Sequence, residues 1–500
     1  MTAQRRIRLI LIALGALLAL TSGSAVSAAT SQLKVVNGTP KMFLDGKPFD
    51  FVYTQVYYFP DDMPEHRDVP RYGSPEWIHN FKAIIDSAAV AGAKVVQPHI
   101  WWSDLDRANS RPATIASTLD FGPLDQAFDY ARQKGLFVMP VLGMQGFTPR
   151  WWKKENRIPE TWEANTSCEF CETDSHGNGY YNPSMGHPKV QRDFGDFVSA
   201  LVTRYRSHAA VIGWMFGVGP TNENSFGPSY ILVDGLGGHK GVGRKPFMFT
   251  DYSPFYQNEF KTWATRKYGT DEYLRKAWGD AKVSLATLRI PEAKEMLRSG
   301  VDKMHLFPDP QSVNDQELKR ILTAKGLDFF LFRRHMRFRD ITYYTNIFKT
   351  LDPEHVLILN SPDNETLDMA MVDGASYNPP LNIHSGERHP DQLHRIMSDA
   401  EAVLKHDKLV LFSCENAYHT PPNAARGIWE EQAQIDYLEA VGKAIKCLGG
   451  IMGYVSDLLP TGTSNRWMPS WHSRQTQEVI KSLVSYTPKK DCRCAVVKDI

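Results

Sequence analysis

Apolar runs alternate along the chain with longer stretches of helical periodicity. Eight of these runs have the length of a β-strand and are apolar throughout, rather than at every second position. They cover residues 50–58, 93–102, 136–144, 211–219, 355–360, 371–378, 408–415 and 450–457. Because strands that are apolar on both faces are typical of a parallel sheet covered by helices, the pattern predicts an α/β protein.

The stretches between these runs predict helices. The one that begins at Ser74 opens with Ser-Pro-Glu, a capping and first-turn signature, and ends at a turn that contains glycine. Residues 121–135 have the same form and also end at a glycine. Further helices are predicted at 188–207, 314–350, 391–406, 430–447 and 472–485. Eight strands alternating with helices predict a (β/α)8 TIM barrel, in which 371–378 is the weakest strand.

One connection, between the fourth and fifth predicted strands, is much longer than the others. It runs from about 217 to 354 and contains a predicted helix pair within "FYQNEFKTWATRKYGTDEYLRKAWGD". Because loops of this length without secondary structure are uncommon, we interpret it as an insertion or lid above the barrel mouth. The sequence thus predicts a single catalytic domain over 32–490, followed by a short C-terminal tail at 491–500.

The first 28 residues have the form of a secretory signal peptide. Arg5, Arg6 and Arg8 precede an apolar run over 9–20, and small residues follow up to Ala28. The apolar run is shorter than the roughly 20 residues that a membrane-spanning helix needs. We therefore expect a cleaved signal, a secreted or periplasmic protein, and no membrane attachment after cleavage.

Charge and motifs narrow the class of partner. The chain has 57 basic and 56 acidic side chains and a formal net charge of +1, so no overall field attracts nucleic acid. The glycine-rich "DGLGGHKGVGR" lacks the spacing of a nucleotide-binding loop and is interpreted as a mouth loop. No H-E-x-x-H motif occurs. We expect no cofactor and no metal, and the oligomeric state stays open.

Six cysteines follow the predicted signal, and an oxidising compartment favours disulfides among them. The sequence does not determine their pairing. An alternative is that "CEFC" and "CRC" together bind zinc, and Cys414 is expected to be a small buried residue in an apolar strand. The six are Cys168, Cys171, Cys414, Cys447, Cys492 and Cys494.

Two glutamates follow predicted strands on opposed sides of the barrel. Glu223 lies in "GVGPTNENSFGPSY" after the fourth strand, and Glu415 lies at the end of the seventh. Barrel enzymes carry their chemistry at the carboxyl ends of the strands. Two facing carboxyl groups supply what glycosidic cleavage needs, a proton donor and a nucleophile or base. The alternative for Glu223 is a turn residue in a Gly/Pro loop.

Aromatic and hydrogen-bonding residues crowd the same strand ends. The apolar face of a pyranose stacks on an aromatic ring while its hydroxyl groups need polar partners, so this composition favours a neutral carbohydrate. For the tryptophans the alternative is core or lid packing, for the aspartate it is helix capping, and for His99 and Tyr377 it is a structural role. The predicted substrate-binding residues are Asn222, His99, Trp101, Trp102, Asp104, Tyr377, Tyr418 and Tyr454.

Several segments resemble the catalytic barrel of family 42 glycoside hydrolases, the bacterial β-galactosidase type. They are, in order, "GAKVVQPHIWWSDLD", "LDFGPLDQAFDYARQKGLFVMP", "HAAVIGWMFGVGPTNEN", "FKTWATRKYGTDEYLRKAWGD" and "DGASYNPP", and the resemblance covers about 45–460. It implies that the Asn-Glu pair Asn222–Glu223 provides the acid/base and that Glu415 is the nucleophile. It also implies a hydrogen bond from Tyr377 to the nucleophile, and retention of configuration.

The stretch around Glu223 also resembles a second group. "MFGVGPT" separates Trp214 from Asn222, which is longer than the family 42 pattern, and "GVGPTNENSFGPSY" is similar to the acid-bearing motif of β-amylases. "LFSCENA" is similar to the segment that bears their base. β-Amylases invert configuration and cut α-1,4-glucans, so this resemblance implies another outcome with the same two glutamates. A carbohydrate-binding barrel without activity and a metal-dependent hydrolase are the remaining alternatives.

Overall fold

The computed structural model describes most of the predicted catalytic domain, and the predicted signal segment 1–28 lies outside the described residues. In the described part of the chain, no helix is both long and apolar enough to cross a membrane. The described residues are 29–57, 70–143, 148–158, 168–173, 179–218, 230–231, 248–249, 251–299, 319–320, 322–360, 362, 364–377, 389–412, 431–457, 474–488 and 492.

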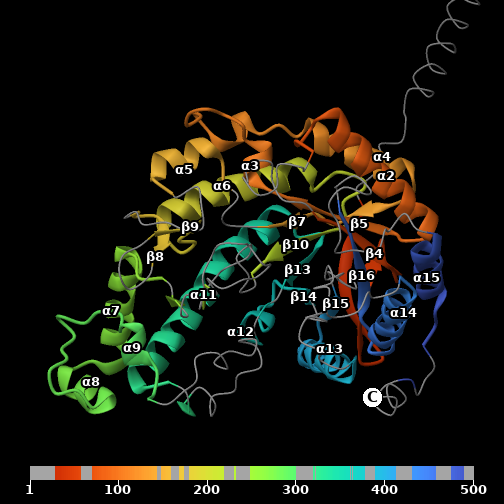
Figure 1. The fold of residues 1–500 in the computed structure, drawn as a ribbon. Coiled ribbons are helices and arrows are strands. Elements are labelled where there is room, and N and C mark those ends of the chain that lie inside the picture. The colour runs from red at the N-terminus through yellow and green to blue at the C-terminus, as the bar shows by residue number, and fades with distance from the viewer. Residues whose placement is uncertain are drawn as a thin grey trace, which may run out of the picture.

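The core of the molecule is a closed barrel of parallel strands (Figure 1). Each strand pairs with its neighbours in sequence order, and pairing between the first and second strands and between the eighth and first closes the ring. All eight predicted strands are confirmed, including the weak one at 371–378, and the third is split in two. The strands are β4 (Tyr53–Tyr57), β5 (Val95–Ile100), β6 (Phe137–Val138) with β7 (Val141–Leu142), β10 (Gly213–Gly217), β13 (Val356–Asn360), β14 (Gly374–Tyr377), β15 (Leu409–Phe412) and β16 (Ile451–Asp457).

The predicted helices surround the barrel, with ends close to those expected except for the helix predicted at 314–350, which begins at Ala324. The Ser74 hydroxyl caps the first of them by accepting a 3.2 Å hydrogen bond from the Trp77 backbone, and Gly92 ends it with a left-handed φ of 81°. The outer helices are α2 (Pro75–Ala91), α4 (Gly122–Gln133), α6 (Pro188–Tyr205), α11 (Ala324–Leu351), α13 (His389–Leu404), α14 (Glu431–Cys447) and α15 (Arg474–Ser485).

A small antiparallel sheet covers the amino end of the barrel. Its strands β1 (Ser31–Val36), β2 (Thr39–Leu44) and β3 (Lys47–Pro48) are joined by Asn-Gly and Asp-Gly turns, in which all four residues have positive φ. Met42 and Leu44 of β2 share one apolar cluster with the inward-facing residues of the barrel strands. This sheet was not predicted from the sequence, although both turn dipeptides are hairpin signals.

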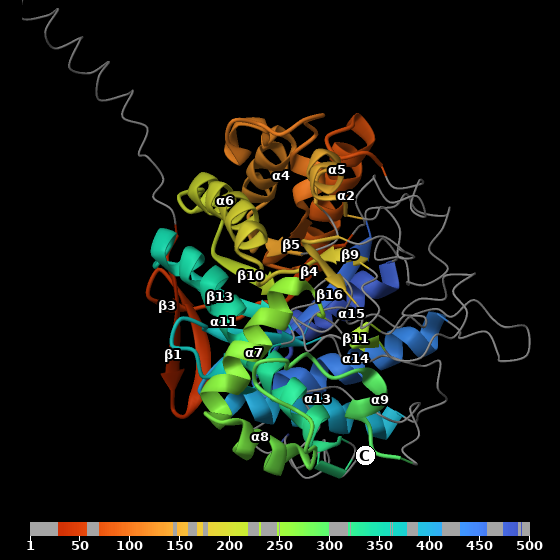
Figure 2. The same ribbon diagram turned by 90° about the vertical axis from the view of Figure 1, so that its left-hand side faces the viewer.

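The long connection after β10 contains the predicted helix pair, which is confirmed as α7 (Pro254–Tyr268) and α8 (Asp271–Trp278). With α9 (Ala293–Met296) these helices pack on the first half of α11 and form an apolar cluster of their own (Figures 1 and 2). The second half of α11 packs against α6 as the fourth outer helix of the barrel. The predicted insertion at 217–354 therefore includes one helix of the barrel itself.

Asp328 of α11 joins the helix pair to the barrel. Its carboxylate accepts hydrogen bonds from Lys267 Nζ at 2.6 Å, from Trp278 Nε1 at 2.8 Å and from the Tyr268 hydroxyl. All three donors belong to the "KYGTDEYLRKAW" part of the segment that resembles family 42 enzymes. The conspicuous residues of this segment thus have a structural role.

The cysteines that the structure describes form two disulfides, Cys168–Cys171 and Cys447–Cys492, with Cα separations of 5.5 and 5.7 Å. The alternative of a zinc site built from "CEFC" and "CRC" is wrong, because the Cys168 and Cys171 sulfurs are bonded to each other. The second disulfide links the predicted tail to the end of α14. Cys414 and Cys494 lie outside the described residues.

Candidate active site

The carboxyl ends of β10 and β15 lie three strand positions apart in the barrel, with β13 and β14 between them. β10 ends at Gly217 and β15 at Phe412, and the chain reaches Glu223 and Glu415 shortly after these ends. Four predicted site residues lie outside the described residues: Asn222, Glu223, Glu415 and Tyr418. The structure describes the strand ends before them and the residues that directly follow β5 and β7.

His99 lies on the interior face of β5 near the mouth. Side chains alternate along a strand, so Val95, Gln97 and His99 share one face, and Val95 belongs to the interior cluster. The Gln97 amide also reaches inward, with Nε2 at 3.3 Å from Met139 Sδ. The His99 side chain is buried, and burial lowers its pKa to about 3. His99 is therefore a neutral imidazole, which has one donor and one acceptor nitrogen.

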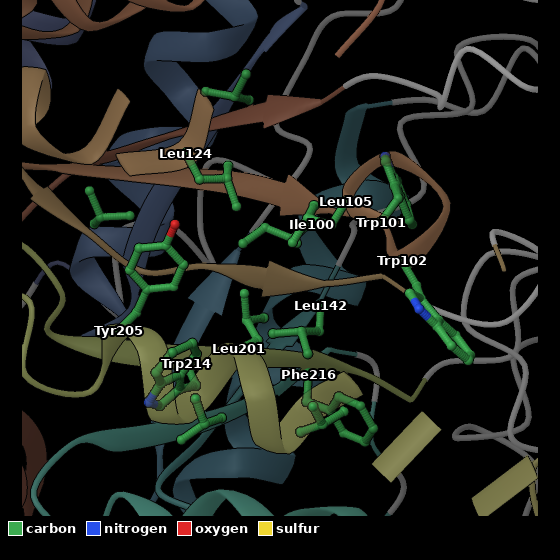
Figure 3. Packing of buried hydrophobic residues seen from close by; sticks show 14 of the residues in the cluster. Ile100, Trp101, Trp102, Leu105, Leu124, Leu142, Leu201, Tyr205, Trp214 and Phe216 are labelled. Atoms are coloured by element: carbon green, nitrogen blue, oxygen red, sulfur yellow. The ribbon is translucent and has the colours of Figure 1, made fainter. Parts of the chain in front are cut away.

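Trp101 follows β5 and packs beside His99, with 5.3 Å between the ring centroids and 39° between the planes. The indole also covers Gly143, which directly follows β7. A Cβ at residue 143 would lie 1.9 Å from the Trp101 ring, so the indole occupies the space of a side chain there. Figure 3 shows Trp101 beyond the end of its strand. The structure thus brings together two of the predicted substrate-binding residues, His99 and Trp101.

Trp102 has a different environment from the one predicted. It is the first residue of α3 (Trp102–Leu105), and its ring is buried. It stacks on Phe197 of α6 at 5.6 Å and lies 5.9 Å from Trp152 of α5 (Arg150–Asn156). These contacts support the packing alternative for Trp102, because the turn into α3 directs consecutive tryptophans to different sides.

The aspartates after β5 are both buried. Asp106 accepts hydrogen bonds from Trp151 Nε1 at 3.0 Å and from the Ala108 backbone at 3.2 Å, which is a structural role. Asp104 lies in α3, and its charge adds to burial, the larger cause, in raising the pKa of Tyr72. A substrate contact by Asp104 stays a prediction.

Tyr377 and Tyr454 lie on the outer face of their strands. Tyr377 packs with the cluster that includes Ile396 of α13, and its hydroxyl donates a long hydrogen bond of 3.5 Å to the Pro362 carbonyl. Tyr454 belongs to the large cluster between strands and helices, and burial raises its pKa above the ordinary value. These positions indicate packing roles, and the sugar contacts proposed for both tyrosines stay predictions.

Two further polar residues lie near the mouth ends of barrel strands, Asn360 as the last residue of β13 and Ser376 as the next to last of β14, and both are buried. The Asn360 carbonyl accepts a 3.1 Å hydrogen bond from the Val218 backbone and so joins the ends of β13 and β10. Neither residue was selected from the sequence. A polar residue that closes the apolar run "VLILN" was the available signal for Asn360.

Metal ligands do not gather in the part of the chain that the structure describes: no group of three or more His, Cys, Asp or Glu side chains there has the geometry to hold an ion. The chemistry that the described mouth offers is that of hydrogen-bonding side chains and an indole ring beside the ends of β5, β7 and β13.

Solved structures with the same architecture include enzymes of the two kinds that the sequence resembles. The catalytic domain of β-amylase from Paenibacillus polymyxa superposes with a TM-score of 0.57 at 13% identity, over 87% of this chain and all of that domain. The β-galactosidase from Bacillus circulans sp. alkalophilus gives 0.56 at 13% identity, over 90% of this chain and 56% of that one. The β-galactosidase from Marinomonas ef1 superposes with a TM-score of 0.55 at 13% sequence identity, over 87% of this chain and 59% of that one.

A curated relative matches part of the chain in sequence. It is a β-amylase from Bacillus cereus, 22% identical over 228 residues, which are 43% of this chain and 38% of the relative. No protein-family model matches. The chain thus spans well under two thirds of this relative and under two thirds of the β-galactosidases above. It is a (β/α)8 TIM barrel with the architecture found in β-galactosidases and in the catalytic domain of a β-amylase.

Proposed function

We propose that the protein is a secreted glycoside hydrolase that cleaves neutral oligo- or polysaccharides, with Glu223 as proton donor and Glu415 as nucleophile or base. The observation that carries the proposal is the order of strands. The two glutamates follow β10 and β15, the fourth and seventh positions of a closed barrel, in the chain of a protein whose architecture is shared by glycosidases.

The dimensions of an eight-stranded barrel are compatible with this pair. Strands spaced about 4.8 Å apart and tilted by about 36° form a ring roughly 15 Å across, so the fourth and seventh strands are separated by about 14 Å. This separation exceeds the roughly 5 to 5.5 Å between the carboxyl groups of retaining enzymes and the roughly 6.5 to 9.5 Å of inverting ones, so carboxyl groups that project inward from the two sides of such a ring can serve either mechanism.

The described mouth residues favour an uncharged substrate. His99 is neutral because burial lowers its pKa to about 3, and Trp101 adds an aromatic ring beside it. A neutral imidazole has one donor and one acceptor nitrogen, which matches a hydroxyl group, whereas an anionic substrate would need a cation here. A sugar hydroxyl near His99 therefore fits the chemistry of this part of the mouth.

Within this class, we propose a retaining β-galactosidase type as the first candidate. Its support is the ordered set of family 42 segments in the sequence and the β-galactosidase structures that share the fold. The barrel matches only part of each of those chains, so their assembly is not carried over.

An inverting α-glucan hydrolase is the second candidate, and one specific observation favours it. The curated sequence relative is a β-amylase, and a β-amylase catalytic domain is covered over its whole length. The Gly-x-Gly-Pro-x-x-Glu spacing around Glu223 agrees with this alternative.

A substrate screen with product analysis tests the proposal. The protein would be incubated with lactose, β-1,4-galactan, maltotetraose and soluble starch, and the first-formed anomer would be identified by proton NMR. Release of β-galactose from a β-galactoside supports the first candidate, and release of β-maltose from an α-glucan supports the second. Binding of a glycan without any product would contradict the proposed hydrolase and favour a carbohydrate-binding barrel.

A further inference from the structure

One face of α11 carries buried charged and polar residues instead of apolar ones. Arg333, Arg337, Asp340 and Tyr344 are spaced by four, three and four positions, so they lie on the same side of the helix. Each is at most 5% exposed. This face meets segments from three other parts of the chain, and its contacts lie at both ends of a shorter connection, from Val218 to Asp251, whose sequence contains Glu223.

Arg337 holds the entrance of that connection. Its guanidinium donates a 2.8 Å hydrogen bond to the carbonyl of Val218, the residue directly after β10. The Val218 N–H donates in turn to the Asn360 carbonyl at 3.1 Å. Both backbone polar groups of Val218 are thus occupied, and Val218 itself is fully buried. A charged donor makes a stronger hydrogen bond than a neutral one, so the position of Val218 at the end of β10 is firmly set.

Arg333, one turn earlier on α11, lies at the other end of this connection, beside Asp251 and Tyr256, and we call this end the return point. Its guanidinium lies 4.4 Å from the ring centroid of Tyr256. It also faces Asp251: burial raises the pKa of Asp251, and the attraction of Arg333 opposes that rise. Asp251 accepts backbone hydrogen bonds from Thr173 at 3.1 Å and Ser253 at 2.8 Å. The return point is therefore fixed to β8 (Cys171–Thr173) and to α11.

Asp340 connects this return point to α6. Its carboxylate accepts hydrogen bonds from the Tyr256 hydroxyl at 2.8 Å and from Gln191 Nε2 at 3.2 Å. Arg339 Nε, 3.2 Å away, adds a third contact. Tyr256 is thus held between Arg333 and Asp340, and the two ends of the connection share one rigid helix as their support.

We propose that Arg337 and Arg333 are positioning residues for the general acid. They fix Val218 and Asp251, the described residues on either side of the segment whose sequence contains Glu223, and the proposed proton donation by Glu223 therefore depends on these two contacts. This inference rests on the proposed role of Glu223. Neither arginine is assigned a contact with the substrate.

The leaving group distinguishes positioning of the acid from general stability. A sugar or alkyl leaving group needs protonation, whereas 2,4-dinitrophenolate departs without it. The probes are therefore lactose and 2,4-dinitrophenyl β-galactoside, or maltotetraose and 2,4-dinitrophenyl α-maltoside when the screen identifies α-glucans. Arg337→Met is expected to lower kcat/KM, which reports the bond-cleavage step alone, on the first substrate of the pair by about tenfold or more and on the dinitrophenyl substrate by less than about threefold. Arg337→Lys, which keeps a cationic donor, should recover part of the loss.

Three comparisons make the experiment decisive. Arg334→Met, on the same helix but lining the outer hollow with Leu331 and Phe338, should leave both rates unchanged. The positioning role would be overturned if folded Arg337→Met and Arg333→Met lost equally on both substrates or lost nothing on either. If one of these variants does not fold, Arg337→Lys is measured in its place. Glu223→Gln is measured in parallel. If it lacks the leaving-group dependence, the proposed acid is wrong; if it has the dependence and the arginine variants do not, only this inference fails.

Discussion

The indole of Trp101 occupies the space where residue 143 would carry a side chain, so that a Cβ on Gly143 would lie 1.9 Å from the ring. Gly143→Ala is therefore expected to displace Trp101 and to lower the free energy of unfolding by about 1 to 3 kcal/mol, the usual cost of overpacking. Because Trp101 packs on His99, the Michaelis constant for the sugar should rise as well.

Chemical denaturation and steady-state kinetics of Gly143→Ala measure these two effects. Gly122→Ala is the matched control, since its new Cβ would meet only the Asp120 side chain at 3.2 Å. Unchanged stability and an unchanged Michaelis constant for Gly143→Ala would show that the indole has room to move and that its position is unimportant for binding.

His99 predicts a specific dependence of stability on pH. Its pKa is about 3 in the folded protein, against the ordinary value of 6.5 for a histidine in the unfolded chain, so the unfolded chain binds the proton more readily. Stability from the neutral form is fully present above pH 6.5 and is lost as the pH falls toward 3, by on the order of 5 kcal/mol in total. His99→Asn should lack this component.

Urea denaturation at several pH values between 4 and 7.5 checks the prediction. The difference in unfolding free energy between the wild type and His99→Asn should shrink by about 1.4 kcal/mol per pH unit below about 6. His335→Asn, at an exposed position of α11, should follow the wild type. A difference that stays constant with pH would contradict a buried, neutral His99.

The disulfide Cys447–Cys492 closes a loop that contains α15, the last outer helix. Its removal in Cys492→Ser should lower the free energy of unfolding by about 2 to 4 kcal/mol, because the unfolded chain gains freedom. The double variant Cys447→Ser/Cys492→Ser should be no less stable than the single one, since both remove the same bond. Additive losses from the two substitutions, measured by thermal denaturation, would argue against this pairing.

Asp328 predicts a local effect in the helix pair. Asp328→Asn replaces a carboxylate that accepts hydrogen bonds from Lys267, Tyr268 and Trp278 by an amide with a single acceptor oxygen. Amide hydrogen exchange in α7 and α8 should become faster by an amount equivalent to about 1.5 to 3 kcal/mol, while that of α2 and α4 stays unchanged. Glu272→Gln, on the exposed side of α8, is the control. If protection from amide exchange were lost equally in all four helices, or in none of them, the local role of Asp328 would be contradicted.

The fold was predictable because buried parallel strands are apolar throughout and the helices between them have ordinary caps. Even the short run at 371–378 forms β14, where Gly374 and Ala375 fit between neighbouring strands. The sheet β1 to β3 was missed because its strands are half exposed and only their Asn-Gly and Asp-Gly turns are distinctive.

The site was less predictable, because residues that follow a strand are not all directed into the mouth. Trp101 and Trp102 are adjacent in the sequence, yet the first packs on His99 and the second on Phe197. Arg337 was missed for another reason. A charged residue within a long helix is usually solvent-exposed, and its partner, the Val218 carbonyl, lies far away in the sequence.

The central claim is that Glu223 and Glu415 carry out glycosidic cleavage together, and the turnover of Glu223→Gln and Glu415→Gln on the glycan identified by the screen tests it most directly. Each variant should fold like the wild type and lose about 10³-fold or more in kcat, whereas Glu354→Gln, at an exposed position beside the amino end of β13, should retain full activity. Turnover close to that of the wild type in either of the first two variants would contradict the account.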